Sequence, residues 1–198
     1  MPTHAKTALL PWLLSLVFGL VMVFSATAVS AQDQMVPAEI GGRFMLEDHN
    51  GQIVTDQHYR GQFLLITFGY TYCPDICPTN LVNMSDALAH LGEKAAQVAP
   101  VFVTIDPKRD TAERLRDYVD HFDQRIVGLT GPQPMIDSIS KRYKIVTDVH
   151  RPEGWDQEDY IVDHTASIFL MSPEGGFLVK FAHGMDPKAM AKRITEFM

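Results

Sequence analysis

The chain has 198 residues, 46% of them hydrophobic, which is enough for one domain with a sizeable core. Its formal net charge is −7, and its Lys and Arg residues form no cluster. Both observations argue against nucleic acid as a partner, because such proteins need basic patches.

The first 31 residues read as a targeting segment. A basic start precedes an apolar run at residues 9–24, and small residues follow, with Val29 and Ala31 placed as at a signal cleavage site. This pattern predicts a signal peptide that is removed before Gln32.

The alternative is that the apolar segment stays in place as an uncleaved membrane anchor, since residues 8–31 are long enough to span a bilayer. No repeat or Gly/Ser linker divides residues 32–198, so we expect them to form one domain. In either case we expect export, to the bacterial periplasm or the outer face of the inner membrane.

Beyond residue 40 the predicted elements alternate between strands and helices. Continuous apolar runs predict strands covered on both faces, and apolar residues at helical spacing predict helices. An Asn50-Gly51 turn predicts a hairpin. The expected order is a hairpin of 43–46 with 53–54, a strand at 63–68, a helix ending at Gly92, a strand at 101–105, a helix at 110–122, a short strand at 126–129, a helix at 135–143, a hairpin of 166–171 with 177–181, and a last helix opened by Asp186-Pro187.

This order is that of a thioredoxin-like α/β sandwich, with a central mixed sheet flanked by helices and an N-terminal hairpin. It places Cys73 and Cys77, the only two cysteines, just past the end of a central strand and at the start of a helix. Open α/β sheets carry their chemistry at this end of their strands.

Three interpretations of the cysteine pair stay open on spacing alone. A helix N-terminus favours the thiolate, as expected of a redox pair. An exported chain with two cysteines can also use them as a structural disulfide, although a five-residue loop stabilises little. Two thiolates could otherwise form an incomplete metal site that needs a third ligand.

His164 is the candidate for that third ligand. It lies in Asp163-His164-Thr165, directly ahead of the predicted strand 166–171, and in this fold that loop faces the cysteine loop. Asp163 is a candidate for orienting the imidazole ring. A purely structural histidine remains the alternative from the residues alone.

Three motifs in order resemble the Sco/SenC family of copper chaperones: Cys73-Pro-Asp-Ile-Cys77-Pro, Ile105-Asp-Pro-Lys-Arg-Asp-Thr111 and Asp163-His164-Thr165. The resemblance covers residues 40–198. It implies a thioredoxin-like fold and copper bound by Cys73, Cys77 and His164. It also implies delivery of that copper to the binuclear copper centre of cytochrome c oxidase, in its copper-bearing subunit. An upstream copper donor and a thiol reductant are candidates for further partners.

The chemistry of the residues agrees with this resemblance. Two thiolates and one imidazole suit Cu(I), and they also hold Cu(II) when a further weak ligand approaches, whereas zinc ordinarily takes a fourth ligand. Asp75 and Asp163 are candidates for supporting the ligands by hydrogen bonds, although Asp75 could instead cap the following helix. Asp106 and Asp110 are interpreted as structural, with Asp110-x-x-Glu113 resembling a capping box.

Two other classes use the same cysteines. An exported thiol–disulfide oxidoreductase would reduce a partner's cysteines before metallation. Such enzymes usually have a cis-proline in the loop at 163–166, and this chain has no proline there. A peroxidase is disfavoured because no distinctive arginine accompanies Cys73 in its motif.

Overall fold

The computed structural model describes residues 40–156 and 158–198. The predicted signal peptide, residues 1–31, lies outside the described residues. Within the described part, no helix combines the length and the apolar character needed to cross a membrane.

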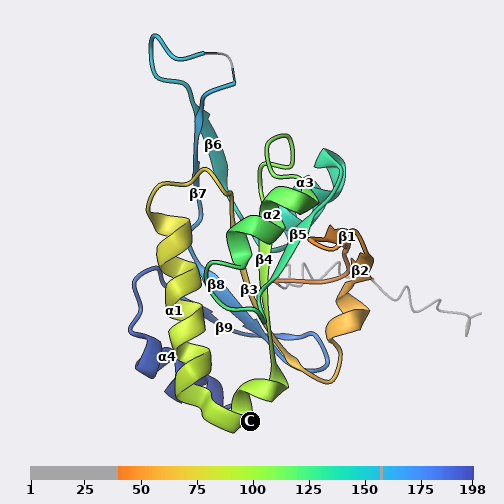
Figure 1. The fold of residues 1–198 in the computed structure, drawn as a ribbon. Coiled ribbons are helices and arrows are strands. Elements are labelled where there is room, and N and C mark those ends of the chain that lie inside the picture. The colour runs from red at the N-terminus through yellow and green to blue at the C-terminus, as the bar shows by residue number, and fades with distance from the viewer. Residues whose placement is uncertain (1–39, 157) are drawn as a thin grey trace, which may run out of the picture. The chain divides into compact units, whose positions relative to one another are not determined.

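A seven-stranded mixed sheet forms the centre of the fold, as predicted (Figure 1). Its order is β2-β1-β5-β4-β3-β8-β9. Strands β3, β4 and β5 are parallel, whereas β8 runs antiparallel to β3 and β1 runs antiparallel to β5. The strands are β1 (Met45–Asp48), β2 (Ile53–Thr55), β3 (Phe63–Gly69), β4 (Val98–Thr104), β5 (Val127–Thr130), β8 (Ile168–Met171) and β9 (Phe177–Phe181).

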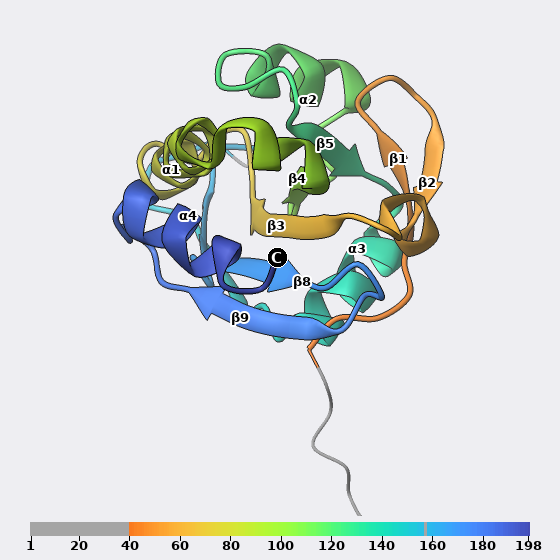
Figure 2. The ribbon, with the colours of Figure 1, turned by 90° about the horizontal axis from the view of Figure 1, so that it is seen from below.

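Helices cover both faces of this sheet. Figure 2 shows α1, α2 and α4 on one face and α3 on the other. Right-handed crossovers from β3 to β4 and from β4 to β5 place α1 and α2 on the same face. The helices are α1 (Ile76–Leu91), α2 (Ala112–Val119), α3 (Gln133–Arg142) and α4 (Pro187–Thr195), with short 3-10 helices at Asp56–Tyr59 and Gly92–Gln97.

The register of the two central strands determines where the loops after them meet. All seven residues of β3 are buried, and β3 pairs with β4 from Phe63 opposite Val98 to Gly69 opposite Thr104. Because both parallel strands end at the same level, the loop with Cys73 and the loop with Asp106 emerge side by side.

Strands β6 (Thr147–His150) and β7 (Ile161–His164) form a separate two-stranded sheet. We call residues 147–164 the arm, and Figure 1 shows it projecting from the end of the main sheet. The prediction that His164 lies in a plain loop was wrong, since it ends β7. All four residues of β6 are exposed, so no burial pattern marked this strand.

The predicted capping role of Asp110 was also wrong. Thr111 is the N-cap of α2, where its side chain accepts a hydrogen bond from Arg114 N at 3.2 Å. Asp110 is instead fully buried, and its carboxylate accepts hydrogen bonds from other residues, described below.

Candidate metal centre

The structure brings Cys73, Cys77 and His164 together. Their ligand atoms all lie within 4.8 Å of one another. His164 Nε2 is 3.2 Å from Cys77 Sγ, and the backbone N–H of Cys77 donates to Cys73 Sγ at 3.4 Å. Because α1 begins at Ile76, Cys77 occupies its first turn, as predicted.

Cys77 is buried deeply, and Gly69 makes room for it. A Cβ at Gly69 would lie 2.6 Å from Cys77 Sγ and 2.8 Å from a ring carbon of Phe102. Real Cβ atoms do not approach so closely, so the last residue of β3 must be glycine for the sulfur to occupy its place.

A buried carboxylate holds the cysteine loop. Asp110 accepts hydrogen bonds from Thr71 N at 3.0 Å, Thr71 Oγ1 at 2.7 Å and Thr104 Oγ1 at 2.6 Å. Burial raises the pKa of Asp110, and these hydrogen bonds oppose the rise. Asp110 therefore ties the residues before Cys73 to the end of β4.

Tyr70 connects the cysteine loop to the arm. Its hydroxyl accepts a hydrogen bond from Val162 N at 3.1 Å, and its ring meets the His164 ring edge-on, with centroids 6.1 Å apart. Tyr70 is buried at the end of β3. One side chain thus touches both the segment leading to the sulfurs and the strand carrying the imidazole.

The orientation of the imidazole comes from the backbone. His164 Nδ1 lies 3.1 Å from the carbonyl oxygen of Thr165, which can only accept a hydrogen bond. A neutral ring therefore carries its hydrogen on Nδ1 and presents the lone pair of Nε2 toward Cys77.

Neither aspartate predicted to support the ligands does so through its carboxylate. Asp163 and His164 are neighbours on a strand and point to opposite faces, and the Asp163 carboxylate lies 3.0 Å from His150 Nε2 instead. Asp75 occupies the N-cap position of α1 without a side-chain cap. Its backbone carbonyl accepts a hydrogen bond from Thr79 N at 3.2 Å.

The two sulfurs titrate as a pair. A hydrogen bond from the Cys77 side chain, assisted by backbone N–H groups, lowers the pKa of Cys73 to about 4 against the opposing effect of burial. The same interaction with Cys73, together with burial, raises the pKa of Cys77. One proton is thus shared unequally, so the half-buried Cys73 is the thiolate and the buried Cys77 keeps the hydrogen.

Several residues around the centre escaped the sequence interpretation. Tyr70 and Tyr160 lie beside the motifs but match no ligand or capping pattern. Arg109 and Asp110 belong to the Asp-Pro-Lys-Arg-Asp motif, where Arg109 looked like an ordinary loop residue and Asp110 like a helix cap. For Arg109 and Asp110 the available signal was compositional: charged side chains follow within a few residues of a largely apolar strand.

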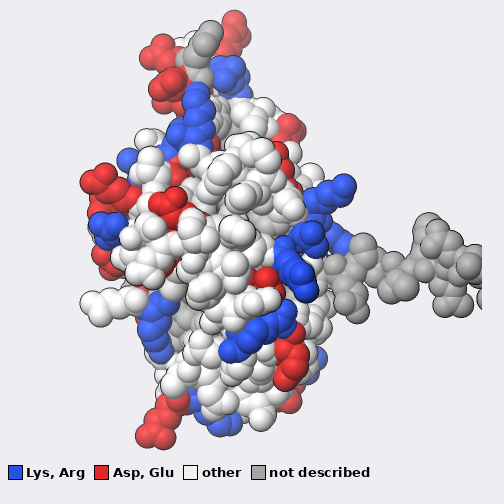
Figure 3. Space-filling view, turned by 90° about the vertical axis from the view of Figure 1, so that its right-hand side faces the viewer, with Lys and Arg blue, Asp and Glu red and all other residues white. Residues whose placement is uncertain are grey.

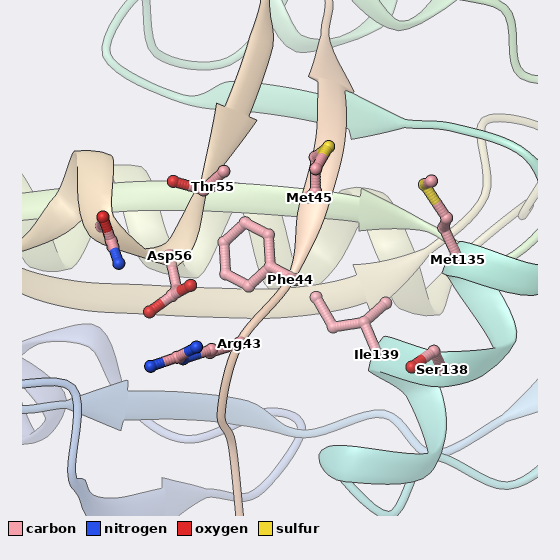
Figure 4. A pocket seen from close by; sticks show the side chains of 9 residues that line it. Arg43, Phe44, Met45, Thr55, Asp56, Met135, Ser138 and Ile139 are labelled. Carbon is pink, nitrogen blue, oxygen red and sulfur yellow. The ribbon is translucent and has the colours of Figure 1, made fainter.

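Other surface features lie apart from this cluster. A pocket of about 390 Å³ opens between the N-terminal hairpin and α3, with Phe44, Met45 and Met135 among its lining residues (Figure 4). Its lining contains neither cysteine nor histidine. Figure 3 shows acidic side chains gathered at the tip of the arm, where Glu153, Asp156 and Asp159 are exposed.

A sequence model of the SCO1/SenC family matches residues 32–198. The chain belongs to this family. It is 40% identical over 162 residues to the mitochondrial SCO1 homolog of Mus musculus, and 38% identical over 160 residues to protein sco1 of Schizosaccharomyces pombe. Each alignment covers 80% of this chain, but only 56% and 61% of the relatives' own length.

Solved structures of the family show the same fold. The structure of Bradyrhizobium japonicum ScoI with copper bound superposes with a TM-score of 0.74 at 36% identity, covering 80% of this chain and 99% of that one. This agreement confirms the thioredoxin-like fold predicted from the order of elements.

The contact between Gly69 and Cys77 generates a first prediction. Gly69→Ala should displace Cys77 Sγ, so the reduced apo protein should lose the low thiol pKa and much of its metal binding. Gly176→Ala is the matched control, because a Cβ there meets only Ser172 Oγ at 3.6 Å. Thiol titration by ultraviolet absorbance would measure the change, and a Gly69→Ala protein with the parent's titration curve would contradict the packing argument.

The unequal sharing of the proton generates a second prediction. In the reduced apo protein, iodoacetamide should modify Cys73 rather than Cys77, as mapped by mass spectrometry. The Cys73 pKa of about 4 lies below its ordinary value, so the thiolate persists as the pH falls and is lost only when the pH passes through 4. The alkylation rate should therefore change little between pH 8 and pH 5, whereas an ordinary thiol loses about tenfold per pH unit below its pKa of about 8.5. A tenfold loss per unit at Cys73 in this range would refute the assignment.

Proposed function

We propose that this chain is a copper metallochaperone that binds one copper ion through Cys73, Cys77 and His164. The observation that carries the proposal is the convergence of two sulfurs and one imidazole nitrogen within 4.8 Å. A thiolate lies about 2.3 Å from an ion such as zinc, so three ligands around one ion in a plane lie about 4 Å apart. The spacing therefore suits a shared ion with little rearrangement.

The donor set favours copper among the available metals. Two thiolates and an imidazole suit Cu(I), a soft ion that is satisfied by three ligands. Within the described residues, the candidate cluster contains no fourth His, Cys, Asp or Glu, as a closed zinc site would require. The same three residues can hold Cu(II) when water or a weak ligand completes the shell. The copper-bound state of Bradyrhizobium japonicum ScoI supports this choice.

We further propose that the recipient is the copper-bearing subunit of cytochrome c oxidase, as the family resemblance implies. The half-buried Cys73 is the ligand that a recipient can approach, whereas Cys77 is 1% exposed. Ligand exchange can then begin at Cys73 while Cys77 and His164 still hold the ion. An upstream donor would load the centre by the reverse sequence.

Thiol–disulfide exchange is the second candidate, and the low pKa of Cys73 favours it. The Cys73 thiolate would attack a partner's disulfide, break its S–S bond and form a mixed disulfide, with the partner's first thiolate as the leaving group. Cys77, after losing its proton to solvent, would then attack Cys73 Sγ and release the partner's second thiolate. The partner gains two electrons, the Cys73–Cys77 pair becomes a disulfide, and an external thiol must reduce it again.

Copper loading and dithiol chemistry respond differently to one substitution. The parent protein without residues 1–31 should bind one equivalent of Cu(I), with two sulfurs and one nitrogen in X-ray absorption. Disulfide formation should abolish binding, because it removes both thiolates. His164→Ala should weaken copper binding by about 100-fold or more, because loss of a ligand should cost at least the upper end of the 10–100-fold range for groups that only support ligands, yet leave the disulfide able to form.

Cysteine variants provide the control for that experiment. Cys73→Ser and Cys77→Ser should each lose both tight Cu(I) binding and the internal disulfide. A first shell without sulfur would refute the copper proposal. A His164→Ala protein that binds Cu(I) and Cu(II) as tightly as the parent would make the histidine structural and leave thiol–disulfide exchange as the better function.

We also propose that residues 1–31 direct export and are then removed. Mass spectrometry of protein from membrane and soluble fractions should find chains that begin at Gln32. Ala31→Phe should block cleavage, because the enzyme that removes signal peptides requires a small residue there. An intact parent chain in the membrane fraction would instead show a retained anchor.

A further inference from the structure

The position of His164 depends on how the arm is attached to the main domain. Among the described strands, β6 and β7 pair with each other and with no strand of the central sheet. His164 therefore takes no part in the backbone hydrogen bonds of the main sheet, which fix the strand before the cysteine loop. Besides the chain connection to β8, which begins at Ile168, side-chain contacts at the base of the arm can supply that restraint.

The strongest of these contacts form a closed set around Asp106. One carboxylate oxygen of Asp106 accepts the Tyr160 hydroxyl at 2.7 Å, and the other accepts Arg109 Nε. Arg109 Nη1 donates to the Tyr160 carbonyl oxygen at 3.0 Å, and its guanidinium lies 3.6 Å from the centre of the Tyr160 ring. Asp106 and Arg109 come from the loop after β4, whereas Tyr160 directly precedes β7.

The contacts between Asp106, Arg109 and Tyr160 are shielded from water enough to restrain the arm. Asp106 is 5% exposed and the Arg109 side chain is 12% exposed. A hydrogen bond between buried charged groups is stronger than one in water, and leaving one partner unpaired is costly. Burial, followed by the contact with Asp106, raises the pKa of Tyr160 to about 12, so its hydroxyl remains a donor throughout the neutral range.

We propose that Asp106, Arg109 and Tyr160 act as a latch that positions His164 over the cysteine pair. The latch fixes the residue at which the chain enters β7, four residues before His164. Tyr70, which lies 5.6 Å from the Arg109 guanidinium, continues the restraint through its hydrogen bond with Val162 N. These are positioning residues, and the proposal rests on the copper-binding function proposed above.

The latch should act through the imidazole and leave the positions of the two sulfurs unchanged. The cysteine loop is held separately, by Asp110 and by the start of α1. Loosening the arm therefore should alter the nitrogen ligand and spare the two sulfurs. This separation distinguishes a positioning role from a general loss of stability.

Tyr160→Phe removes the hydroxyl and keeps the ring. In competition with a Cu(I) chelator, this variant should bind copper about tenfold more weakly than the parent, within the range for residues that orient a metal ligand. The Cys73–Cys77 pair should still form its internal disulfide, as in the parent. In a His164→Ala background the same substitution should cause no further loss of affinity, since it acts only through His164.

Lys108→Gln is the matched control. Lys108 lies in the same loop as Arg109 and pairs with Glu158 of the arm at 3.8 Å, but both side chains are exposed, so this contact should contribute little. Arg109→Lys supplies a second variant if Tyr160→Phe folds poorly. It keeps the charge but lacks the planar fork with which Arg109 donates to Asp106 and to the Tyr160 carbonyl oxygen at the same time.

A metal-free measurement separates failure of the latch from failure of copper binding. Hydrogen exchange of the apo protein should be faster at the β7 amides in Tyr160→Phe than in the parent or Lys108→Gln, with the β3 amides unchanged. Unchanged β7 exchange would overturn the latch, whether or not the parent binds copper. Equal losses of copper affinity with and without His164 would overturn it too.

Discussion

His164 Nε2 lies 3.2 Å from Cys77 Sγ, and the rest of the centre depends on this short distance being maintained. The two atoms belong to residues 87 positions apart in the chain. Cys77 lies at the start of α1, and His164 lies at the base of the arm, where β7 ends. A shared ion tolerates errors of only a few tenths of an ångström in ligand position. The segment with Cys77 and the segment with His164 must therefore each be held in place, so that their ligand atoms stay close together.

The cysteine side of the centre gains its restraint from the central sheet. The equal ends of β3 and β4 bring Thr71 and Thr104 to the same buried carboxylate of Asp110, and Gly69 leaves the space that Cys77 fills. The imidazole side lies on a strand that does not pair with this sheet, and Tyr70 and the contacts at Asp106 add to its chain connection to β8. The centre thus combines a rigid half with a half held by side chains.

The electronic state of the sulfurs follows from the same geometry. Because Cys77 is buried and Cys73 is half-exposed, the one proton that the pair retains stays on Cys77. Copper binding must remove that proton, and disulfide formation uses the electron pairs that would bind the metal. Metal loading and oxidation are therefore competing reactions of one pair of atoms.

Much of the fold was readable from the chain because its signals are local or strongly periodic. The apolar run at Phe63–Phe68 predicted β3, and Asn50-Gly51 predicted the first hairpin; both are confirmed. The arm gave no comparable signal, because β6 is exposed along its whole length. Asp110 was misread because its local pattern matches a helix cap, whereas burial beside Thr71 and Thr104 decided its role.

The sequence by itself determined the family of folds and the position of the two cysteines at a helix start, and its resemblance to a known family indicated the three residues proposed to bind copper. Those features depend on hydrophobic periodicity, on helix-end chemistry and on motif order, which a linear chain carries directly. Only the tertiary structure decided that Thr165 rather than Asp163 orients the imidazole, and that Tyr70, Arg109 and Tyr160 hold the arm. These contacts join residues that are distant along the chain or turned to opposite faces of a strand, so their partners are set by packing in three dimensions.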